Sequence, residues 1–472
     1  MKELSEYDFV YETKKIKKNV SASKLFKTLY CDENNSFLYE SLETTGEIGR
    51  YSILGSTPLC IFEAKDNNCK IRFDENIVKE KGNPFDILNS VLKNFRHYPK
   101  IPPFSGGAVG YVSYDSIRYI EKIPNNNPED PPLPDMYFIF PSEIVIINNE
   151  NSTAEIIVFG DSKSKISERV NEIEKIIKNY NDEVVNKEDN FLKTDDKQTE
   201  FTSNFDKNEF EKIVKKAKEY IREGEIFQVV LSQRFEFEVR EEPFEIYKQL
   251  RVKNPSPYMY YIKFNDLYIL GSSPETLIKS ENRIAISRPI AGTRRRGKDS
   301  KEDAKLEKEL LSDEKELAEH IMLVDLARND LGRVCNYGSV KVDKLMKIEK
   351  YSKVMHIVSD IRGRLRNEVD SMELFKAAFP AGTVTGSPKI RAMEMIDELE
   401  PVRRGIYAGG IGYFGFNGDV DFCIAIRTII IKGKRGFIQA GAGIVSDSIP
   451  ENEYMETLNK ASALKLTISE EK

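Results

Sequence analysis

The sequence predicts an α+β protein built mainly on antiparallel sheet. Short strand-like stretches follow one another closely in its second half, among them IFQVVLSQRFEFEV (226–239), VDFCIAIRTIII (420–431) and GFIQAGAGI (436–444). Helical segments such as 206–225 stand between the strands. Strands so closely spaced are typical of antiparallel pairing and not of a doubly wound parallel sheet.

The chain divides at a polar segment. Its first part contains short strands and turns with few helices, for example at 37–55 and 143–149. Residues 186–205 lack apolar periodicity, which is typical of a linker. We therefore predict a domain at 1–185, a linker at 186–205 and a second domain at 206–472.

Composition excludes several classes of function. The 472 residues carry a net charge of −6 with both signs interspersed, so no basic surface for nucleic acid is expected. No apolar run is long enough to span a membrane and no signal peptide is recognisable, so we expect a cytoplasmic protein without a membrane partner. Five cysteines without C-x-x-C spacing indicate neither a zinc ribbon nor a disulfide framework.

Two pairs of glutamates are the most informative feature. Glu316 and Glu319 lie three residues apart on one predicted helix, and Glu453 and Glu456 lie three apart on another. Residues with this spacing share a helix face. Two such helices side by side would bring four carboxylates together, a donor set that suits Mg²⁺. The alternative for either pair alone is a solvated or capping role.

The surroundings of each pair favour a site. Asp313 and Glu316 fit a capping box, but the helix that follows, at about 314–328, is apolar around most of its circumference and should be buried. A buried glutamate is costly unless it is paired or bound to metal. On the other helix Lys460 continues the stripe of Glu456 and could meet a substrate carboxylate.

Two further segments suggest anion binding. In GTVTGSPK, Ser387 fits a helix N-cap and Pro388 fits the first helical position. The free amides of such a helix N-terminus can bind an anion. The alternative is a well-capped helix that binds no ligand. Alternation along 421–431 places Arg427 beside small neighbours in an apolar strand. One interpretation is that the Arg427 guanidinium binds a ligand carboxylate through two parallel hydrogen bonds. The other is that it forms a structural ion pair.

The glycine segment at 441–443 and His356 can each be interpreted in two ways. Gly441, Ala442 and Gly443 are expected after a strand, where bare backbone could approach a ligand or form a tight turn. His356 lies in an apolar, strand-like run, where it is either a hydrogen-bonded core histidine or a general acid or base beside a metal site. His320 adjoins Glu319 and would support it.

A series of motifs follows in order along the chain: GEIFQVVLSQRF, PYMYYI, GSSPE, RPIAGTRRRG, AEHIMLVDLARNDLGRV, VMHIVSDIRG, GTVTGSPK, RRGIYAGGIGY, QAGAGIV and EYMETLNKA. Together they resemble one known family, the chorismate-binding enzymes, and within it most closely the large subunits of anthranilate synthase. The resemblance covers nearly the whole chain and is strongest from about 220 to 465. It implies large, mainly antiparallel sheets packed as a sandwich with helices on the outside.

The resemblance implies roles for individual residues. Glu319 and Glu456 match Mg²⁺ ligands, Glu316 and Glu453 match acidic partners that help to position metal and water, and His356 matches the active-site histidine. The positions that match contacts to chorismate are Gly292, Thr293, Thr385, Tyr407, Arg427, Gly441, Ala442, Gly443 and Lys460.

The implied reaction adds ammonia at C2 of chorismate with loss of the C4 hydroxyl, and elimination of pyruvate then gives anthranilate. His356 and Glu316 are the candidates for the proton transfers, without an assignment of acid and base. Water-adding relatives carry a lysine where this chain has Gln228, and many aminodeoxychorismate synthases carry a lysine where it has Ala291. Aminodeoxychorismate synthase, the alternative, stays open because some members carry alanine there.

The resemblance also implies regulation and a partner. Ser41 on one side, and Pro257, Tyr258 and Met259 on the other, match a tryptophan site that would make 1–185 a regulatory domain, although related enzymes can retain this pocket without feedback. No G-x-C-x-G glutaminase turn is present, so ammonia would come from a separate glutamine amidotransferase subunit, in an assembly of two of each. A binding module that has lost its chemistry is disfavoured because the matched Glu, Arg and His residues are all present.

Overall fold

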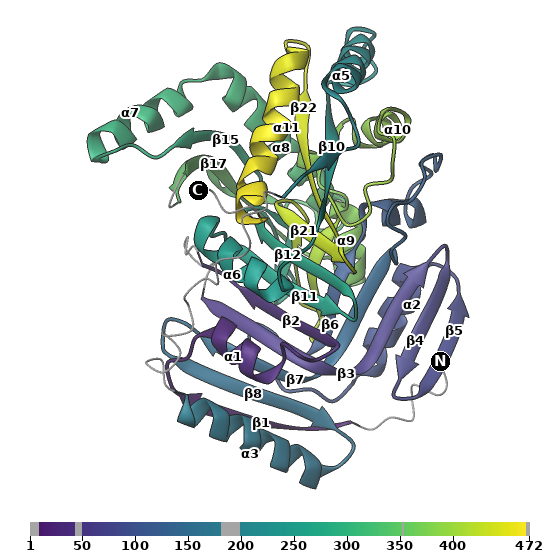
Figure 1. Cartoon of the computed structure of the whole chain (residues 1–472), viewed down its shortest axis with the longest axis vertical. Coiled ribbons are helices and arrows are strands. Elements are labelled where there is room, and N and C mark those ends of the chain that lie inside the picture. Colours follow the sequence, from purple (N-terminus) through teal and green to yellow (C-terminus); the bar gives the residue numbers. More distant parts are fainter. Residues whose placement is uncertain (1–8, 43–49, 181–198, 352–353, 469–472) are drawn as a thin grey trace.

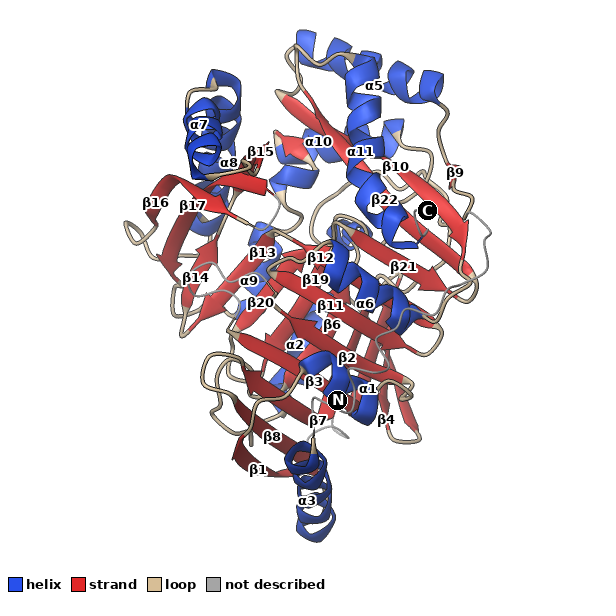
Figure 2. Ribbon diagram, turned by 60° about the vertical axis from the view of Figure 1, so that its left-hand side comes forward, coloured by secondary structure: helices blue, strands red, loops and turns tan. Residues whose placement is uncertain are grey.

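The computed structural model describes residues 9–42, 50–180, 199–351 and 354–468. Strands form the interior of the molecule and most helices lie at its periphery (Figures 1 and 2). Hydrogen-bonded pairings join the strands of this described part into one sheet system, and the registers are antiparallel throughout. The prediction of antiparallel sheets packed as a sandwich with outer helices is therefore confirmed.

The strands are β1 (Val10–Lys17), β2 (Asn35–Glu40), β3 (Tyr51–Lys65), β4 (Asn68–Phe73), β5 (Asn76–Lys81), β6 (Gly107–Val112), β7 (Met136–Asn148), β8 (Thr153–Gly160), β9 (Thr202–Ser203), β10 (Gln228–Glu238), β11 (Tyr258–Phe264), β12 (Leu267–Ser273), β13 (Thr276–Glu281), β14 (Ile284–Ser287), β15 (Ile290–Arg295), β16 (Lys341–Lys350), β17 (Val354–Arg364), β18 (Gly386–Ser387), β19 (Gly410–Gly415), β20 (Val420–Ile424), β21 (Thr428–Lys432) and β22 (Arg435–Ile444).

The helices are α1 (Ala22–Leu29), α2 (Pro84–Asn94), α3 (Lys163–Asn179), α5 (Lys207–Arg222), α6 (Pro243–Lys253), α7 (Ser300–Leu311), α8 (Glu314–Gly332), α9 (Ser371–Ala378), α10 (Lys389–Leu399) and α11 (Pro450–Ile468), with short 3₁₀ turns η2 (Tyr114–Tyr119) and η3 (Gly382–Val384).

Strand β7 shows why the sandwich is stable. All of its side chains are buried, because successive residues point to opposite faces of a sheet and both faces are covered. Phe138 and Phe140 pack into a cluster with helices α2 and α9, whereas Tyr137 and Ile139 pack into the cluster between the sheet layers. The strand is therefore mostly apolar on both faces and shows no regular alternation, and its one charged residue, Glu143, pairs with Arg169.

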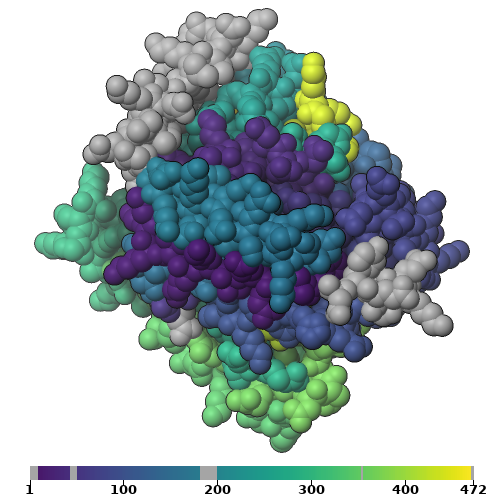
Figure 3. Space-filling model, turned by 90° about the horizontal axis from the view of Figure 1, so that it is seen from below, coloured from purple at the N-terminus to yellow at the C-terminus, as the bar shows by residue number. Residues whose placement is uncertain are grey.

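The two predicted domains share this sheet. Strand β2 pairs with β11, and β6 pairs with β19, so strands from before and after the predicted linker are neighbours. Most of the predicted linker, 186–198, lies outside the described residues, and the boundary stays a prediction. Seen from below, the N-terminal part of the chain covers much of the surface (Figure 3).

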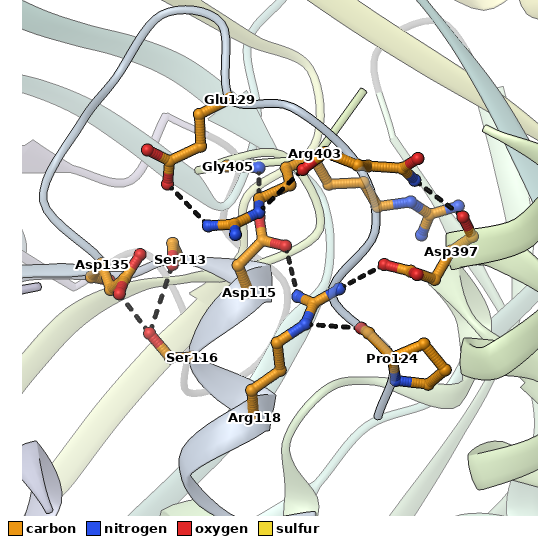
Figure 4. A network of polar contacts seen from close by, with 12 residues as sticks. Ser113, Asp115, Ser116, Arg118, Pro124, Glu129, Asp135, Asp397, Arg403 and Gly405 are labelled. Carbon is orange, nitrogen blue, oxygen red and sulfur yellow. Dashed lines mark hydrogen bonds and ion pairs between the residues drawn. The ribbon is translucent and has the colours of Figure 1, made fainter. Parts of the chain in front are cut away.

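A polar strap formed by residues 120–135 adds a second connection (Figure 4). Arg118, on η2 just before the strap, donates to the Pro124 carbonyl at 2.8 Å. It also contacts Asp115 and Asp397, each at 2.5 Å, and Asp397 lies on α10. Arg403 donates to Glu129 at 3.0 Å and to the carbonyl of Asn127 at 3.1 Å. The strap therefore fastens the N-terminal strands to the segment that follows α10.

Replacing Arg118 tests this strap. Arg118→Ala leaves the carboxylates of Asp115 and Asp397 buried without their cation, which typically costs about 3 kcal/mol or more of stability. Urea unfolding followed by fluorescence measures the loss. Lys93→Ala is the control, because Lys93 pairs with Asp370 at an exposed position, where an ion pair contributes less than about 1 kcal/mol. Equal losses for the two variants would contradict the role of the strap.

Candidate active site

Helix α8 begins as predicted. Asp313 is its N-cap and accepts hydrogen bonds from the amides of Lys315 and Glu316. The Glu316 carboxylate turns towards Arg294, whose guanidinium lies 3.2 Å away. Glu319, one turn later, accepts a hydrogen bond of 3.2 Å from the side-chain amide of Gln228 on β10. Burial raises the pKa of Glu319, and Gln228 opposes this shift.

The prediction that this helix is buried around most of its circumference is wrong. Ile321 is 51% exposed and Ala318 lies on the same outer face, while Leu323, Ala327 and Leu331 point inwards. The helix packs mainly against β15, β17 and α9, and the face that carries Ala318 and Ile321 remains in contact with solvent. His320, fully buried beside Glu319, bonds the Ser359 hydroxyl, and burial lowers its pKa to about 4.

Helix α11 carries the second pair of glutamates. Glu453 is 8% exposed, and burial raises its pKa. Glu456 is more exposed and forms an ion pair with Lys460 at 2.7 Å. Lys460 also donates to the carbonyl of Gly441 at 3.0 Å, which fixes α11 against β22.

The two helices influence each other electrostatically. The charge of Lys460 on α11 favours the ionised form of Glu319, and Lys315 on α8 does the same for Glu453. Both carboxylates nevertheless keep raised pKa values, which shows that their negative charge is incompletely compensated by the protein. In the described part of the chain, no three His, Cys, Asp or Glu side chains lie close enough together to hold a metal ion.

The segment Gly441–Gly443, which has almost no side chains, forms one wall of the candidate site and lies within a strand. Gly441, Ala442 and Gly443 lie inside β22, paired with β10, so their expected position after a strand is wrong. A Cβ at Gly441 would be 2.9 Å from the Tyr407 hydroxyl, and one at Gly443 would be 2.8 Å from Nε2 of Gln228. The absence of side chains therefore lets both polar groups lie directly against the strand.

Arg427 occupies a break between two strands. The continuous strand expected over 420–431 is interrupted after Ile424, and Arg427 has a φ of 51° before β21 begins. Both faces of β20 are buried. The sequence pattern that suggested one long strand therefore could not show where the hydrogen-bonded pairing ends.

The break leaves Arg427 available to an anion. Its guanidinium donates to the Lys460 carbonyl at 3.4 Å, and no acidic side chain among the described residues pairs with it. Burial lowers its pKa, an effect that nearby Tyr407 partly opposes. The structural ion pair considered as the alternative is not observed.

Gly292, Thr293 and His356 form a third part of the site. Gly292 has a φ of 64° at an irregular point in the β15–β17 pairing, and a Cβ there would be 3.2 Å from Oε2 of Glu316. Nδ1 of His356 lies 3.1 Å from the Gly292 carbonyl and 3.0 Å from the Thr293 hydroxyl. Because a carbonyl only accepts, this contact favours the tautomer with a proton on Nδ1. His356 is half-buried, so it is not a fully enclosed core residue.

Thr385 is buried, and its hydroxyl donates to the Ala381 carbonyl at 2.9 Å. The predicted cap nearby is wrong by one position. Helix α10 begins at Lys389, and Pro388 is its N-cap without a side-chain hydrogen bond. Ser387 instead pairs with Gln228 in the short ladder between β18 and β10.

A buried ion pair that the sequence did not reveal supports this wall. Arg404 and Glu400 are almost completely buried and lie 2.6 Å apart. Arg404 also donates to the carbonyls of Val384 and Val230 at 2.6 and 2.7 Å and lies over the ring of Tyr407. Burial raises the pKa of Tyr407 to about 12, so its hydroxyl stays protonated.

Glu275 is a second residue that sequence reasoning missed. It belongs to the GSSPE motif, and its side chain is 9% exposed. Its carboxyl forms neither an ion pair nor a regular hydrogen bond with another described residue. Burial raises its pKa to about 7, which Thr383 and Lys460 partly oppose. Only the motif pointed to this residue, because the segments that bury it are remote in sequence.

A separate cleft brings the predicted tryptophan-site residues together. Ser41, Pro257, Tyr258 and Met259 all line it, so both halves of the chain contribute. The Tyr258 hydroxyl lies 2.9 Å from the Asp421 carboxylate and 3.0 Å from the Thr276 hydroxyl.

Comparison with known proteins identifies the family. The family model for chorismate binding enzymes matches residues 34–466. The chain belongs to the chorismate-binding enzymes. It is 47% identical over 461 residues to anthranilate synthase component 1 of Acetivibrio thermocellus, covering 96% of this chain and 92% of that protein. It is 42% identical to aminodeoxychorismate synthase component 1 of Bacillus subtilis, with 90% of each covered.

Solved structures of this chorismate-binding family agree. Anthranilate synthase component I from Streptococcus pneumoniae superposes with a TM-score of 0.79 at 39% identity, covering 90% of this chain and 93% of that one. A menaquinone-specific isochorismate synthase from Escherichia coli has a TM-score of 0.72 at 20% identity, covering 99% and 97%, and shares the fold. Within the described residues, no helix is long and apolar enough to cross a membrane.

The raised pKa of Glu275 predicts a pH-dependent cost in stability. The ordinary pKa of a glutamate is 4.5, and that of Glu275 in the folded chain is about 7. At pH values between these two, the unfolded chain has released the Glu275 proton and the folded chain still keeps it. Stability should therefore fall as pH rises through this window, by on the order of 3 kcal/mol at about 1.4 kcal/mol per unit. Glu275→Gln removes this cost and should raise the thermal midpoint at pH 8 but barely at pH 4.

Glu314→Gln, at the exposed start of α8, is the control and should shift the midpoint little at any pH. A gain for Glu275→Gln that is the same at every pH would show that burial does not raise this pKa.

Proposed function

We propose that this chorismate-binding enzyme is the large subunit of an anthranilate synthase, which adds ammonia at C2 of chorismate and then eliminates pyruvate. The observation that carries the proposal is Arg427, a half-buried guanidinium without an acidic partner among the described residues, close to Tyr407 and Lys460. A substrate carboxylate would supply the missing partner. Chorismate has two carboxylates.

Mg²⁺ would bind the other carboxylate. Glu319, Glu453 and Glu456 would hold the ion, and Glu316 would help to position it and its water. The fit rests on Glu319 and Glu453, two carboxylates at least partly buried that form no ion pair with another described residue. Because the acidic groups lie too far apart in this structure to hold the ion, they would have to close around it. When bound, Mg²⁺ would neutralise the substrate carboxylate.

Proton transfer would involve three residues. Glu275, with a pKa of about 7, can keep a proton at neutral pH and donate it to the leaving C4 hydroxyl. His356 and Glu316, which both lie beside Gly292, remain the candidates for removing the C2 proton during elimination. The buried Thr385 would contact substrate from the β18 side.

Ammonia is the nucleophile that the site favours. Gln228 donates to Glu319 and carries no basic nitrogen, so it cannot activate water as a lysine would. Ala291 offers no amine to attack the ring. Aminodeoxychorismate synthase is the second candidate, because the Bacillus subtilis relative of that name is also 42% identical.

Tryptophan binding to the cleft around Ser41 and Tyr258 would make the reaction subject to feedback. Its lining includes tyrosine rings together with Arg50, Lys279 and Asp421, which suits an aromatic zwitterion. The segment 1–185 would then act as the regulatory domain and 206–472 as the catalytic domain. A coupling route exists because Tyr258 bonds Thr276, the residue that directly follows Glu275.

The name component 1 carried by the relatives implies a second component. We propose a glutamine amidotransferase that supplies ammonia, in a cytoplasmic assembly of two subunits of each kind.

An activity assay tests the proposed reaction. The purified chain, given chorismate, Mg²⁺ and excess ammonium at alkaline pH, should form anthranilate, and chelation should abolish the signal. Glu319→Gln should lower kcat/KM at least roughly 100-fold, since it removes a charged ligand. Glu314→Gln, exposed at the start of the same helix, should retain normal activity. A product that a lyase converts to 4-aminobenzoate would establish the second candidate instead.

Feedback is tested by removing one hydroxyl. Tyr258→Phe keeps the ring but removes the hydroxyl that bonds Thr276 and Asp421. The tryptophan concentration for half inhibition should rise by roughly fivefold, which corresponds to the net contribution of one hydrogen bond. Anthranilate formation is titrated with tryptophan for both proteins. Tyr337→Phe, at a fully exposed position, is the control. Identical titrations for Tyr258→Phe and wild type would remove this hydroxyl from the site.

A further inference from the structure

A second cavity lies directly beside Glu275. Strand β13, helix α8 and the turn η3 enclose it, and its lining includes Glu275, Leu326, Ala327, Asp330 and Thr383. Its lining contains no lysine, arginine or histidine. A dianion such as chorismate would find no counter-charge here, so the cavity suits a small neutral molecule.

One polar atom in this cavity indicates that such a molecule is bound. The Thr383 hydroxyl is buried and has no hydrogen-bond partner within the described part of the chain. It faces Glu275 closely enough to affect that carboxyl, but without regular hydrogen-bond geometry. Buried hydroxyls are almost always hydrogen-bonded, to protein or to ordered water. A water-sized molecule between Thr383 and Glu275 would satisfy both groups.

We propose that this cavity receives the water molecule formed when the C4 hydroxyl of the substrate leaves. The inference rests on the proposed function. The C2–N bond to ammonia forms as the C4–O bond breaks. The ring double bonds C1=C2 and C5=C6 shift to C6=C1 and C4=C5, so the electron pair supplied by nitrogen replaces the pair that leaves with oxygen. The Glu275 proton converts that oxygen to water, and the carboxylate later regains a proton from the ammonium group formed at C2.

The position of the cavity suits this role. Glu275, α8 and η3 contribute to its lining, and Arg427 and Gly441 do not. Water that enters it would meet Thr383 and Asp330, and Asp330 pairs with Lys389 at 2.9 Å near the opposite end of α8 from Glu316. The cavity therefore offers the product water a place apart from the residues proposed to bind the substrate.

Two matched alanines on α8 test the proposal. Ala327 lines the cavity, whereas Ala318 is exposed on the same helix, so replacing either with valine costs the same helix propensity. Ala327→Val should lower kcat by roughly tenfold and leave the KM for chorismate and for ammonium unchanged, because it obstructs only the departing water. Ala318→Val should behave like wild type.

The kinetic constants separate the alternatives. A raised KM for ammonium would make the cavity an entry route for ammonia, and a raised KM for chorismate would make it part of the substrate site. Either result, or no change in kcat, overturns the proposal. If the wild-type protein forms neither anthranilate nor aminodeoxychorismate, the proposed function itself fails.

A stability measurement is independent of catalysis. If water occupies the cavity, Thr383→Val removes one of its hydrogen bonds, and the thermal midpoint should fall. If the cavity is dry, the same variant removes an unpaired buried hydroxyl and the midpoint should rise. A midpoint that rises or stays the same overturns the proposal, whatever the activity of the protein.

Discussion

The ion pair between Glu400 and Arg404 is the interaction on which the candidate site depends. Two opposite charges this deeply buried persist only when every remaining polar atom is bonded. Arg404 meets this requirement by binding the carbonyls of Val384 and Val230, and Glu400 by accepting from the amide and hydroxyl of Ser232. The pair therefore joins η3, β10 and the Tyr407 segment, and it fixes three walls of the site relative to one another.

Much of this arrangement could be predicted from local sequence. The strand-like stretch that became β10, the N-cap at Asp313 and the i, i+3 spacing of the glutamates follow from rules that act within a few residues. The strands were recognisable because their two-residue period and β-branched residues extend over many positions. The family motifs then indicated which of these local features belong together, which no local rule can do.

The remaining features depended on contacts between distant segments. The apolar pattern of 420–431 continues through the break at Arg427 because residues on both faces there are buried, so alternation could not show where the strand ends. Helix α8 covers its neighbours with only one face, although its composition suited burial on all sides. Glu275 lies in an ordinary strand connection, and its raised pKa arises from burial, to which the distant segments α8 and η3 contribute.

The pairing of β2 with β11 and of β6 with β19 has a consequence for how this architecture can be divided. A fragment containing only residues after the predicted linker would expose the edges of β11 and β19, whose backbone groups could then pair with other chains. The halves therefore cannot be exchanged between relatives as independent modules. A chimera would have to transfer the paired strands β2 with β11 and β6 with β19 together, along with the strap of residues 120–135. Surface loops are better positions for a gene fusion than the junction of the halves.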